Sequence, residues 1–469
     1  MDITRNMASE LQKRISGSVI APEDAGYDEA RRTWNVTFEQ KPALIVEVTG
    51  AKDVIEAVKF ARENKMGIAV TATGHGPARA ADDAMLIKTS RMTQVRVSSE
   101  SRTAWIEAGT KWQRVLEEAQ YEGLAPLMGS STDVGAIGYT LGGGMGWLAR
   151  KYGLSADSVN YFEVVTADGE LRKVSRTENS ELFWALCGGG GGLGVVTAME
   201  VKLYPIKEIF GGNLIYPKEG AKEILERYRE WVKTAPDELT TSLTLANFPD
   251  IPMVPEALRG KSVVMVRGAY CGPKEEGEKL IRPWLEWREP LVNMWGTMPF
   301  MEVDSISNDP KDPIPAFVTN VQFDEITDKV IDELIKRAFP ENGMSPLLFC
   351  ETYHTGGAIS RPERGGNAYS HRNGAFILKM IGLTPTPEIR SHLLETVSLL
   401  KYHLRDHLLS NVYINFTEGD EKWHLSKDAF SDEAFSRLQK VKAKYDPENV
   451  FNHSVDITTE PAEILKLSK

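Results

Sequence analysis

A single histidine within a glycine-bearing turn is the residue of this sequence best suited to react with a bound molecule. His75 lies in segment 70–77, directly after an apolar, strand-like run at residues 66–70. Its neighbours Gly74 and Gly76 allow positive φ and a close approach of the backbone to a ligand. Successive backbone N–H groups in such turns bind anions. The segment therefore predicts either a phosphate-cradling loop that holds a cofactor covalently through the imidazole, or a tight turn with a surface histidine.

Two further segments carry side chains that can accept a proton. Glu351 and Tyr353 alternate on a predicted strand at 347–353 and so share one face, whereas His354 points the other way or ends the strand. Tyr413, in a predicted strand at 412–416, would serve as a general base if a neighbour lowered its pKa. The structural alternatives are a packed tyrosine at 413 and an ion pair of Glu351 with a nearby Arg or Lys.

Metal chemistry has little support in the sequence. His403 and His407 are four residues apart on a predicted helix, a spacing that suits a metal pair, but no third ligand accompanies them, so a solvated helix face is the simpler interpretation. The cysteines are three in number, scattered, and without a CxxC pair, which argues against a disulfide framework or a zinc site. We expect no bound metal.

Two glycine-rich islands, at 142–146 and 188–192, match dinucleotide-binding patterns only in their letters. A Rossmann site needs a strand before the glycines and a helix after them. The first island follows the stretch 134–140, which is too interrupted by glycine for a buried strand, and the second follows a helix-like run and precedes a strand. No Gly-Lys-Ser/Thr follows either island, which excludes a P-loop. The glycines instead indicate places where the backbone approaches a large ligand.

Size and charge limit the possible partners. The chain has 469 residues, enough for two or more domains, and a formal net charge of −11, which argues against nucleic acid or an anionic membrane as partner. The N-terminus has no apolar signal sequence, and no run approaches the roughly 20 apolar residues of a membrane span. We expect a cytoplasmic protein acting on a small molecule; the pattern does not decide between a monomer and a homo-oligomer.

The predicted elements change character near Pro205. Strand and helix patterns alternate over 43–205, with strands at 43–48 and 195–203, a helix at 53–65 and a hairpin at 164–171. The following part predicts an antiparallel sheet backed by amphipathic helices. Its strands are expected at 262–270, 347–353 and 375–381, its helices at 325–339 and 388–409, and the tail at 412–416 (strand) and 433–445 (helix).

Taken together and in order, several segments resemble the FAD-linked oxidases of the vanillyl-alcohol oxidase type, in particular the berberine-bridge-enzyme-like branch. The resemblance rests on Thr73-Gly74-His75, the glycine-rich segment 134–144, Lys151-Tyr152-Gly153-Leu154, residues 182–186 and 194–197, Gly356-Gly357-Ala358 with His371-Arg372, Tyr413-x-Asn415, and residues 444–451.

The resemblance implies an α+β, two-domain FAD-binding fold with an antiparallel-sheet substrate domain backed by helices. Residues 1–207 and the C-terminal return 411–469 would form the FAD-binding domain, and residues 208–410 the substrate domain. It further implies FAD attached covalently through His75 and places Tyr413 and Asn415 on the segment that crosses the flavin ring. The expected catalytic residues are Tyr413 as the base, Glu351 as the second choice, and Tyr353 on the same strand face as Glu351. The matching cofactor-binding positions are Thr71, Ala72, Thr73, Gly74, His75, Gly76, Pro77, Gly129, Ser130, Ser131, Val134, Gly135, Gly138, Tyr139, Gly142, Gly143, Gly144, Gly146, Gly194, Val195, Val196, Tyr413 and Asn415.

The chain departs from the family pattern at several positions. Ser131 stands where many members have a second flavin-linking cysteine, so only one covalent bond is expected. Val134, by contrast, agrees with the family, in which a small valine at this position accompanies reaction with O2. The other departures are Thr71 and Thr73 in the histidine loop, Cys187 before the second glycine island, and Ser454 and Asp456 near the C-terminus.

The resulting hypothesis is an FAD-dependent oxidase that oxidises a C–O or C–N bond of a small, neutral or moderately polar molecule and passes electrons to O2, giving H2O2. The protein would orient the substrate while the flavin performs the redox chemistry. The alternatives are an FAD-dependent dehydrogenase with another acceptor, a nicotinamide-dependent reductase, and a non-catalytic flavin-binding module.

Overall fold

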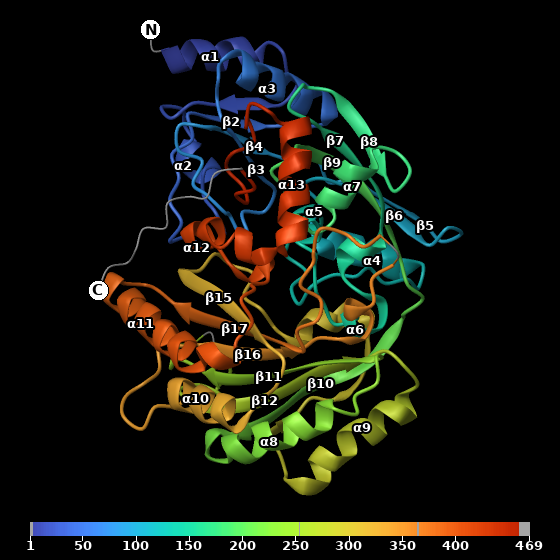
Figure 1. Ribbon diagram of the computed structural model, residues 1–469, viewed down its shortest axis with the longest axis vertical. Helices are drawn as coiled ribbons and strands as arrows, with labels where there is room; N and C mark the ends of the chain where they lie inside the picture. Colours follow the sequence, from blue (N-terminus) through green and yellow to red (C-terminus); the bar gives the residue numbers. More distant parts are fainter. Residues whose placement is uncertain (1–2, 253, 364, 459–469) are drawn as a thin grey trace.

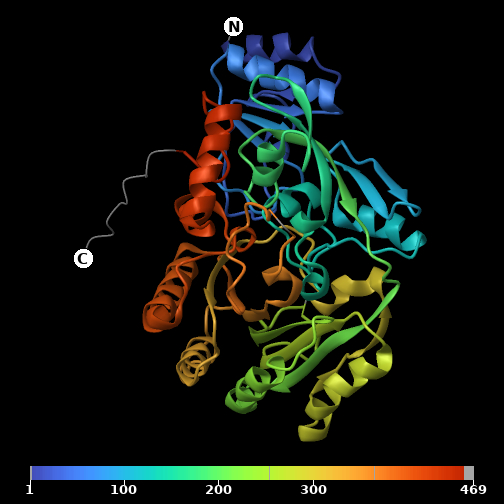
Figure 2. The same cartoon turned by 45° about the vertical axis from the view of Figure 1, so that its right-hand side comes forward.

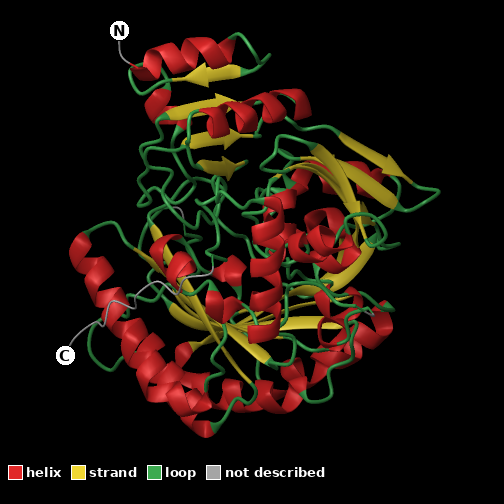
Figure 3. Ribbon diagram, turned by 45° about the horizontal axis from the view of Figure 1, so that its top comes forward, coloured by secondary structure: helices red, strands yellow, loops and turns green. Residues whose placement is uncertain are grey.

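The computed structural model describes residues 3–252, 254–363 and 365–458 (Figure 1). The strands of these residues form three sheets. Two of them lie in the upper part of the molecule with the N-terminus and the C-terminal helix α13, and the largest lies in the lower part (Figures 1 and 2). Loops gather between the small parallel strands and the large sheet, which is where a cofactor site is expected (Figure 3).

The two upper sheets differ in strand direction. In the first, β2 and β3 both pair in parallel with β4, and α3 provides the crossover that a parallel arrangement requires. The second sheet is antiparallel, in the order β5-β6-β9-β7-β8. The strand bounds are β1 Ser18–Ile20, β2 Leu44–Glu47, β3 Ile68–Thr71, β4 Met85–Lys88, β5 Val95–Ser98, β6 Thr103–Glu107, β7 Val159–Val165, β8 Leu171–Ser175 and β9 Val195–Lys202.

The large sheet is antiparallel, in the order β13-β10-β12-β11-β16-β17-β15, with β14 also pairing with β10. Helices α8 to α11 cover one face, as the lower part of Figure 1 shows, and the other face is turned toward the upper part. The bounds are β10 Glu208–Pro217, β11 Leu239–Asn247, β12 Ser262–Tyr270, β13 Val292–Asn293, β14 Gly296–Pro299, β15 Ala316–Phe323, β16 Phe349–His354 and β17 Phe376–Leu383.

Helix positions follow from apolar spacing and from caps. In α3, Val54, Ala57, Val58 and Ala61 are buried at the i, i+3, i+4, i+7 spacing of an amphipathic helix. α10 begins at Asp328, later than expected, because the Thr327 hydroxyl accepts a hydrogen bond from the backbone of the third helical residue. The bounds are α1 Ile3–Gln12, α2 Tyr27–Ala30, α3 Ala51–Glu63, α4 Trp112–Tyr121, α5 Ala136–Leu141, α6 Ala149–Tyr152, α7 Ser180–Leu186, α8 Ala221–Val232, α9 Lys274–Trp287, α10 Asp328–Ala338, α11 Pro387–Leu404, α12 Gly419–His424 and α13 Asp432–Tyr445.

The prediction of a strand at 412–416 is wrong. This segment is irregular and contains a short 3-10 turn, Ile414–Phe416. The reason is that the side-chain amide of Asn320 on β15 satisfies the backbone of Tyr413 on both sides: Oδ1 accepts from its N–H at 2.8 Å and Nδ2 donates to its carbonyl at 2.9 Å. A side chain thus takes the place of a neighbouring strand.

The C-terminal segment packs back onto the upper part. Residues between 412 and 457 share one hydrophobic core with residues from β2 to β9, whereas the large sheet and α8 to α11 form a separate core. The buried Lys442 of α13 fastens this return, donating hydrogen bonds to the Gly192 and Phe451 carbonyls and to the Asp446 carboxylate at 2.7–3.0 Å. None of the described helices combines the length and the apolar character needed to span a membrane.

Candidate functional site

One cavity, at the histidine loop, is formed by four stretches that are far apart in sequence. Its walls come from residues 68–79, 129–147, 190–196 and 415–454, with β11 and β16 of the large sheet at one end. Most of the expected cofactor residues line it. Those that do are Thr71, Ala72, Thr73, Gly74, His75, Gly76, Pro77, Gly129, Ser130, Ser131, Val134, Gly135, Gly138, Tyr139, Gly146, Gly194, Val196 and Asn415; those that do not are Gly142, Gly143, Gly144, Val195 and Tyr413.

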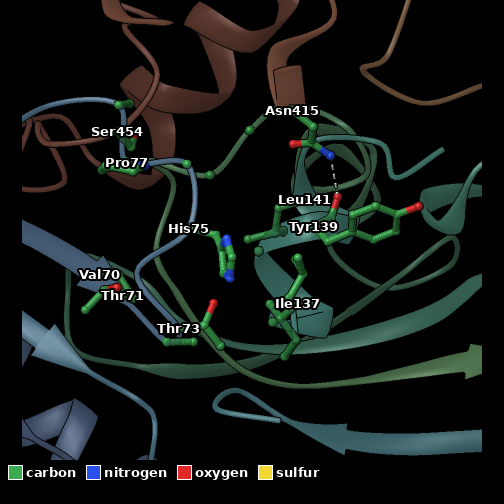
Figure 4. A pocket seen from close by; sticks show the side chains of 18 of the residues that line it. Val70, Thr71, Thr73, His75, Pro77, Ile137, Tyr139, Leu141, Asn415 and Ser454 are labelled. Carbon is green, nitrogen blue, oxygen red and sulfur yellow. Dashed lines mark hydrogen bonds between the residues drawn. The ribbon is translucent and has the colours of Figure 1, made fainter. Parts of the chain in front are cut away.

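His75 extends from the loop after β3 toward Ile137 and Leu141 of α5 (Figure 4). Its ring stacks on Trp34, with 4.7 Å between ring centroids, and its Nε2 lies 3.5 Å from Asp133 Oδ2. Burial lowers the pKa of the imidazole, against the raising effect of Asp133. The histidine is therefore mainly neutral at pH 7, the state in which a ring nitrogen carries a free electron pair.

Glycine at position 74 is required by the backbone. Its φ is +81°, and a Cβ there would lie 2.9 Å from the Trp34 nitrogen. The Trp34 N–H donates to the Gly74 carbonyl at 3.1 Å, so the same close approach brings the tryptophan ring against His75. Trp34 could not be predicted from the sequence, because no motif surrounds it.

Other glycines near the cavity are of two kinds, according to whether a Cβ at that position would enter open space or would clash with protein atoms. A Cβ on Gly138 or on Gly191 would meet no atom within 4 Å, although both residues line the cavity. By contrast, a Cβ on Gly142 would lie 1.9 Å from Asn415 Oδ1, and one on Gly144 would lie 2.5 Å from Tyr139. The expectation that these glycines all face a ligand therefore needs correction: Gly142 and Gly144 make room for side chains, whereas Gly138 and Gly191 border free volume of the kind a cofactor occupies.

The loop around Ser131 is held by hydrogen bonds to two carboxylates of the segment that follows β14. The hydroxyls of Ser130 and Thr132 donate to the carboxylates of Asp309 and Asp304, at 2.5 and 2.8 Å. Ser131 lies between these anchors and lines the cavity. The residue in the second flavin-linking position is thus fixed near the cofactor space but has no thiol to offer.

A charged network lies at the large-sheet end of the cavity. Tyr353 lines the cavity, and its hydroxyl donates to Glu351 Oε2 at 2.6 Å while accepting from Lys379 Nζ at 2.8 Å. Register explains the arrangement, because Lys379 of β17 lies opposite Glu351 of β16. The expected shared face of Glu351 and Tyr353 is confirmed by their hydrogen bond.

Glu351 is buried among cations. It lies 3.2 Å from Lys379 Nζ and 3.3 Å from Arg267 Nη1. Burial by itself raises the pKa of Glu351, but the two cations, with hydrogen bonds from Tyr353 and Ser242, outweigh burial and lower it to about 2. The ion-pair alternative for Glu351 is therefore confirmed, and the carboxylate stays ionised at neutral pH. The sequence signal for its partners was a lone cation in each of two apolar strands, β12 and β17.

His354 ends β16, as expected, and lines the same cavity as Tyr353. Its Nε2 lies 3.2 Å from Nη1 of the buried Arg150, an obligate donor, so Nε2 is the acceptor and Nδ1 carries the proton. Burial and the Arg150 charge lower the pKa of His354 to about 3, so the imidazole is neutral. Nδ1 has no partner within the described protein, which leaves one donor free beside the cavity.

Tyr413 does not occupy the position expected of a base. Its oxygen accepts hydrogen bonds from the backbone N–H groups of Gly144 and Met145 and from Asn415 Nδ2, at 2.9–3.2 Å. Burial raises the pKa of Tyr413 to about 12, against the effect of these bonds, whereas a lowered pKa was expected. Tyr413 is a packed tyrosine that ties the 142–146 island to the C-terminal return.

Lys422 and Glu418 were not found from the sequence. Both are half-buried beside the histidine loop and line the cavity, and Lys422 Nζ donates to the Gly76 carbonyl at 2.9 Å. Burial lowers the pKa of Lys422 to about 8, against the attraction of Glu418.

No metal site is formed within the described residues, since no three His, Cys, Asp or Glu side chains lie close enough together to hold an ion. His407, one of the two helix histidines considered from the sequence, lies 3.4 Å from the Thr327 hydroxyl.

Comparison with known proteins agrees with this geometry. Residues 42–175 match the FAD binding domain family and residues 412–457 match the family described as berberine and berberine like. An FAD-linked oxidoreductase of Dictyostelium discoideum is 26% identical over 456 residues, covering 96% of each chain. The crystal structure of 6-hydroxy-D-nicotine oxidase from Arthrobacter nicotinovorans superimposes with a TM-score of 0.82 at 25% identity, over 95% of this chain and 98% of that one. Glucooligosaccharide oxidase from Acremonium strictum, with a 6-S-cysteinyl, 8α-N1-histidyl FAD, gives 0.83 at 20% identity, over 98% and 100%.

The fold and the cavity therefore define a two-domain FAD-binding fold of the vanillyl-alcohol oxidase type, with an antiparallel substrate-side sheet backed by helices. The chain is an FAD-dependent oxidoreductase, and it is similar to 6-hydroxynicotine oxidase and, over residues 412–457, to berberine-like proteins.

Proposed function

We propose that this protein is an oxidase that holds FAD through one covalent bond to His75 and oxidises a C–O or C–N bond of a small organic molecule, with O2 as the electron acceptor. One observation carries the proposal: a single cavity is lined by the neutral His75 at one place and by Tyr353, whose hydroxyl is bonded to Glu351 and Lys379, at another. The first can hold the cofactor and the second can take the substrate proton.

The residues of the histidine loop and α5 fit FAD. The backbone of 73–77 and the open faces of Gly138 and Gly191 provide space and N–H groups for a phosphate-bearing cofactor. FAD supplies the redox step, since it accepts a hydride from the substrate carbon. Covalent attachment at one point is supported by His75 in the loop and by a serine, rather than a cysteine, at 131.

The Tyr353 network would manage the proton. Burial and the charge of Glu351 raise the pKa of Tyr353 well above its ordinary value, so Tyr353 is a neutral phenol at rest and would act as a relay. As the substrate O–H or N–H loses its proton to the Tyr353 oxygen, the tyrosine would pass its own proton to the Glu351 carboxylate along the 2.6 Å hydrogen bond, in the same step in which the hydride leaves. Lys379 and Arg267 leave the cluster with an excess positive charge. That charge would stabilise the negative charge that develops on the substrate oxygen or nitrogen as its proton leaves.

The substrate end favours neutral, moderately polar molecules. Tyr353, Phe416, Thr240 and a neutral His354 line it. The side chains of Glu351 and Lys379 are buried behind Tyr353 and paired with each other, so neither is free to form an ion pair with a charged substrate. Hydrogen bonding and aromatic contact would therefore provide recognition.

A substrate panel scored by anaerobic bleaching of the flavin tests the proposal, after the purified protein has been precipitated with acid to locate the yellow colour. We expect the colour in the pellet of the wild type and in the supernatant of His75→Ala, bleaching by a small alcohol or amine, and H2O2 on admission of air.

Three outcomes would contradict parts of the proposal. Colour wholly in the wild-type supernatant removes the covalent bond. Bleaching by NADPH alone removes the oxidase reaction. Reoxidation in air that takes many minutes makes the protein a dehydrogenase with another acceptor.

A further inference from the structure

Asp133 is the carboxylate in direct contact with the residue proposed to carry the cofactor. Its Oδ2 lies 3.5 Å from His75 Nε2, a long hydrogen bond, and its Oδ1 accepts from Lys111 Nζ. The side chain is 17% exposed, so the contact is largely shielded from water. The mechanism proposed above makes no use of this residue.

Two further contacts restrict the geometry. Trp34 stacks on one side of the imidazole and fixes the plane of the ring. Lys111 binds the oxygen of Asp133 that does not face His75, which leaves Oδ2 directed at the imidazole. A ring held in plane, with one nitrogen against a carboxylate, has a defined tautomer: Nε2 carries the proton and Nδ1 keeps its electron pair.

We propose that Asp133 is a positioning residue for the covalent attachment of FAD to His75, fixing the imidazole with Nδ1 free to bond and accepting the Nε2 proton when the bond forms. The inference rests on the proposed function, because it requires that His75 be the attachment residue.

The chemistry balances with an oxidant. A new bond joins Nδ1 to the 8α-methyl carbon of FAD; one C–H bond of that methyl group and the N–H bond of the imidazole break. Two protons and two electrons are thereby released from the joined partners, and the electrons enter the flavin ring. Dioxygen then takes them up and becomes H2O2. Asp133 acts only on the Nε2 proton of the imidazole. If this proton stayed on the ring after Nδ1 had formed its bond, the imidazole would be a cation next to the flavin.

The chain offers a matched control. The carboxylate of Asp304 lies next to the same segment as Asp133 and accepts a hydrogen bond from Thr132, but it does not contact His75. Asp304→Asn therefore removes the charge from an anchor of this segment without touching the imidazole. If loop placement alone matters, Asp304→Asn and Asp133→Asn should behave alike.

The experiment follows covalent incorporation directly. The full chain, produced in riboflavin-limited cells, is mixed with FAD in air, and acid-stable flavin is measured over time by intact mass and in-gel fluorescence. Reversible FAD binding is measured separately from flavin retained on gel filtration. We expect Asp133→Asn to bind FAD but to form the bond at least about 100-fold more slowly, the size of effect typical for a lost proton acceptor.

The pH profile distinguishes proton acceptance from structure. The charged groups that act on His75 are Asp133, Lys111 and Asp309. In Asp133→Asn the rate should rise steadily from pH 7 to 9, because hydroxide replaces the missing acceptor, whereas the wild-type rate should stay level. Asp133→Glu should restore a large part of the rate.

Three results would overturn the inference while leaving His75 as the attachment site: equal rates in wild type and Asp133→Asn, an equal loss in Asp304→Asn, or a level pH profile in a slow Asp133→Asn. A wild type that never forms acid-stable flavin would instead refute the proposed covalent cofactor itself. The two failures are therefore distinguishable.

Discussion

Replacement of Tyr353 by phenylalanine removes one oxygen from the centre of the network at the large-sheet end of the cavity. That oxygen donates to Glu351 and accepts from Lys379, at 2.6 and 2.8 Å. Glu351 and Lys379 stay 3.2 Å apart without it, so their ion pair survives the substitution. The expected loss of stability is about 1–3 kcal/mol, the cost of leaving hydrogen-bonding groups unsatisfied. The variant should therefore fold and bind FAD.

The effect on catalysis should be larger than the effect on stability. Loss of a general base slows a reaction about 10²- to 10⁴-fold. At about 1.36 kcal/mol for each factor of ten, the barrier should rise by at least about 2.7 kcal/mol. Stopped-flow measurement separates the two half-reactions: anaerobic reduction of the flavin by a substrate from the panel should slow by this factor, whereas reoxidation by O2 should not change.

Tyr413→Phe provides the comparison in the same assay, since its hydroxyl is also buried but does not line the cavity. Its reduction rate should remain close to that of wild type. Equal reduction rates in wild type and Tyr353→Phe would refute the role of Tyr353, and a slow step confined to Tyr413→Phe would restore the base expected from the sequence.

Three further predictions follow from the described contacts. Tyr413→Phe should lower the unfolding free energy by about 1–3 kcal/mol in denaturant melts, because the N–H groups it binds lose their acceptor; an unchanged midpoint would contradict this. Gly138→Ala should give a chain at least as stable as wild type but with a lower FAD content, because its Cβ enters open cavity. Gly146→Ala should instead destabilise the chain, because its Cβ would lie 1.7 Å from a backbone oxygen. Undiminished FAD in Gly138→Ala would contradict the cofactor placement. The pKa of Glu351 is lowered from 4.5 to about 2, so its ionised form contributes stability above pH 4.5 that is lost as the pH falls toward 2. Between these pH values the free energy of unfolding, measured in denaturant melts, should depend less on pH in Glu351→Gln than in wild type. The same pH dependence in both proteins would refute the buried ion pair.

The histidine loop and most of the surrounding cofactor residues could be predicted because their chemistry is local. A histidine between two glycines after an apolar strand has a recognisable form, and the segment does line a cavity. The shared face of Glu351 and Tyr353 followed in the same way from strand periodicity. In both cases neighbouring residues alone determine the geometry.

The partners of these residues could not be predicted, because distant segments supply them. Trp34 precedes His75 by a helix and two strands, and Lys422 reaches Gly76 across 346 residues of sequence. The error at Tyr413 has the same origin: an amide on β15 pairs with its backbone and replaces the expected strand. Sequence periodicity reports which face of an element is buried, but not which element covers it.

The return of the C-terminal segment has a consequence for the order of events during synthesis. Residues 415–454 form one wall of the cavity, and Lys442 fastens them to the Gly192 carbonyl. Because a ribosome delivers the N-terminal part first, the histidine loop emerges long before the wall that encloses it. If FAD occupies this cavity as proposed, we expect its stable loading to follow synthesis of residues 415–454, and a chain that ends before α13 to retain no flavin.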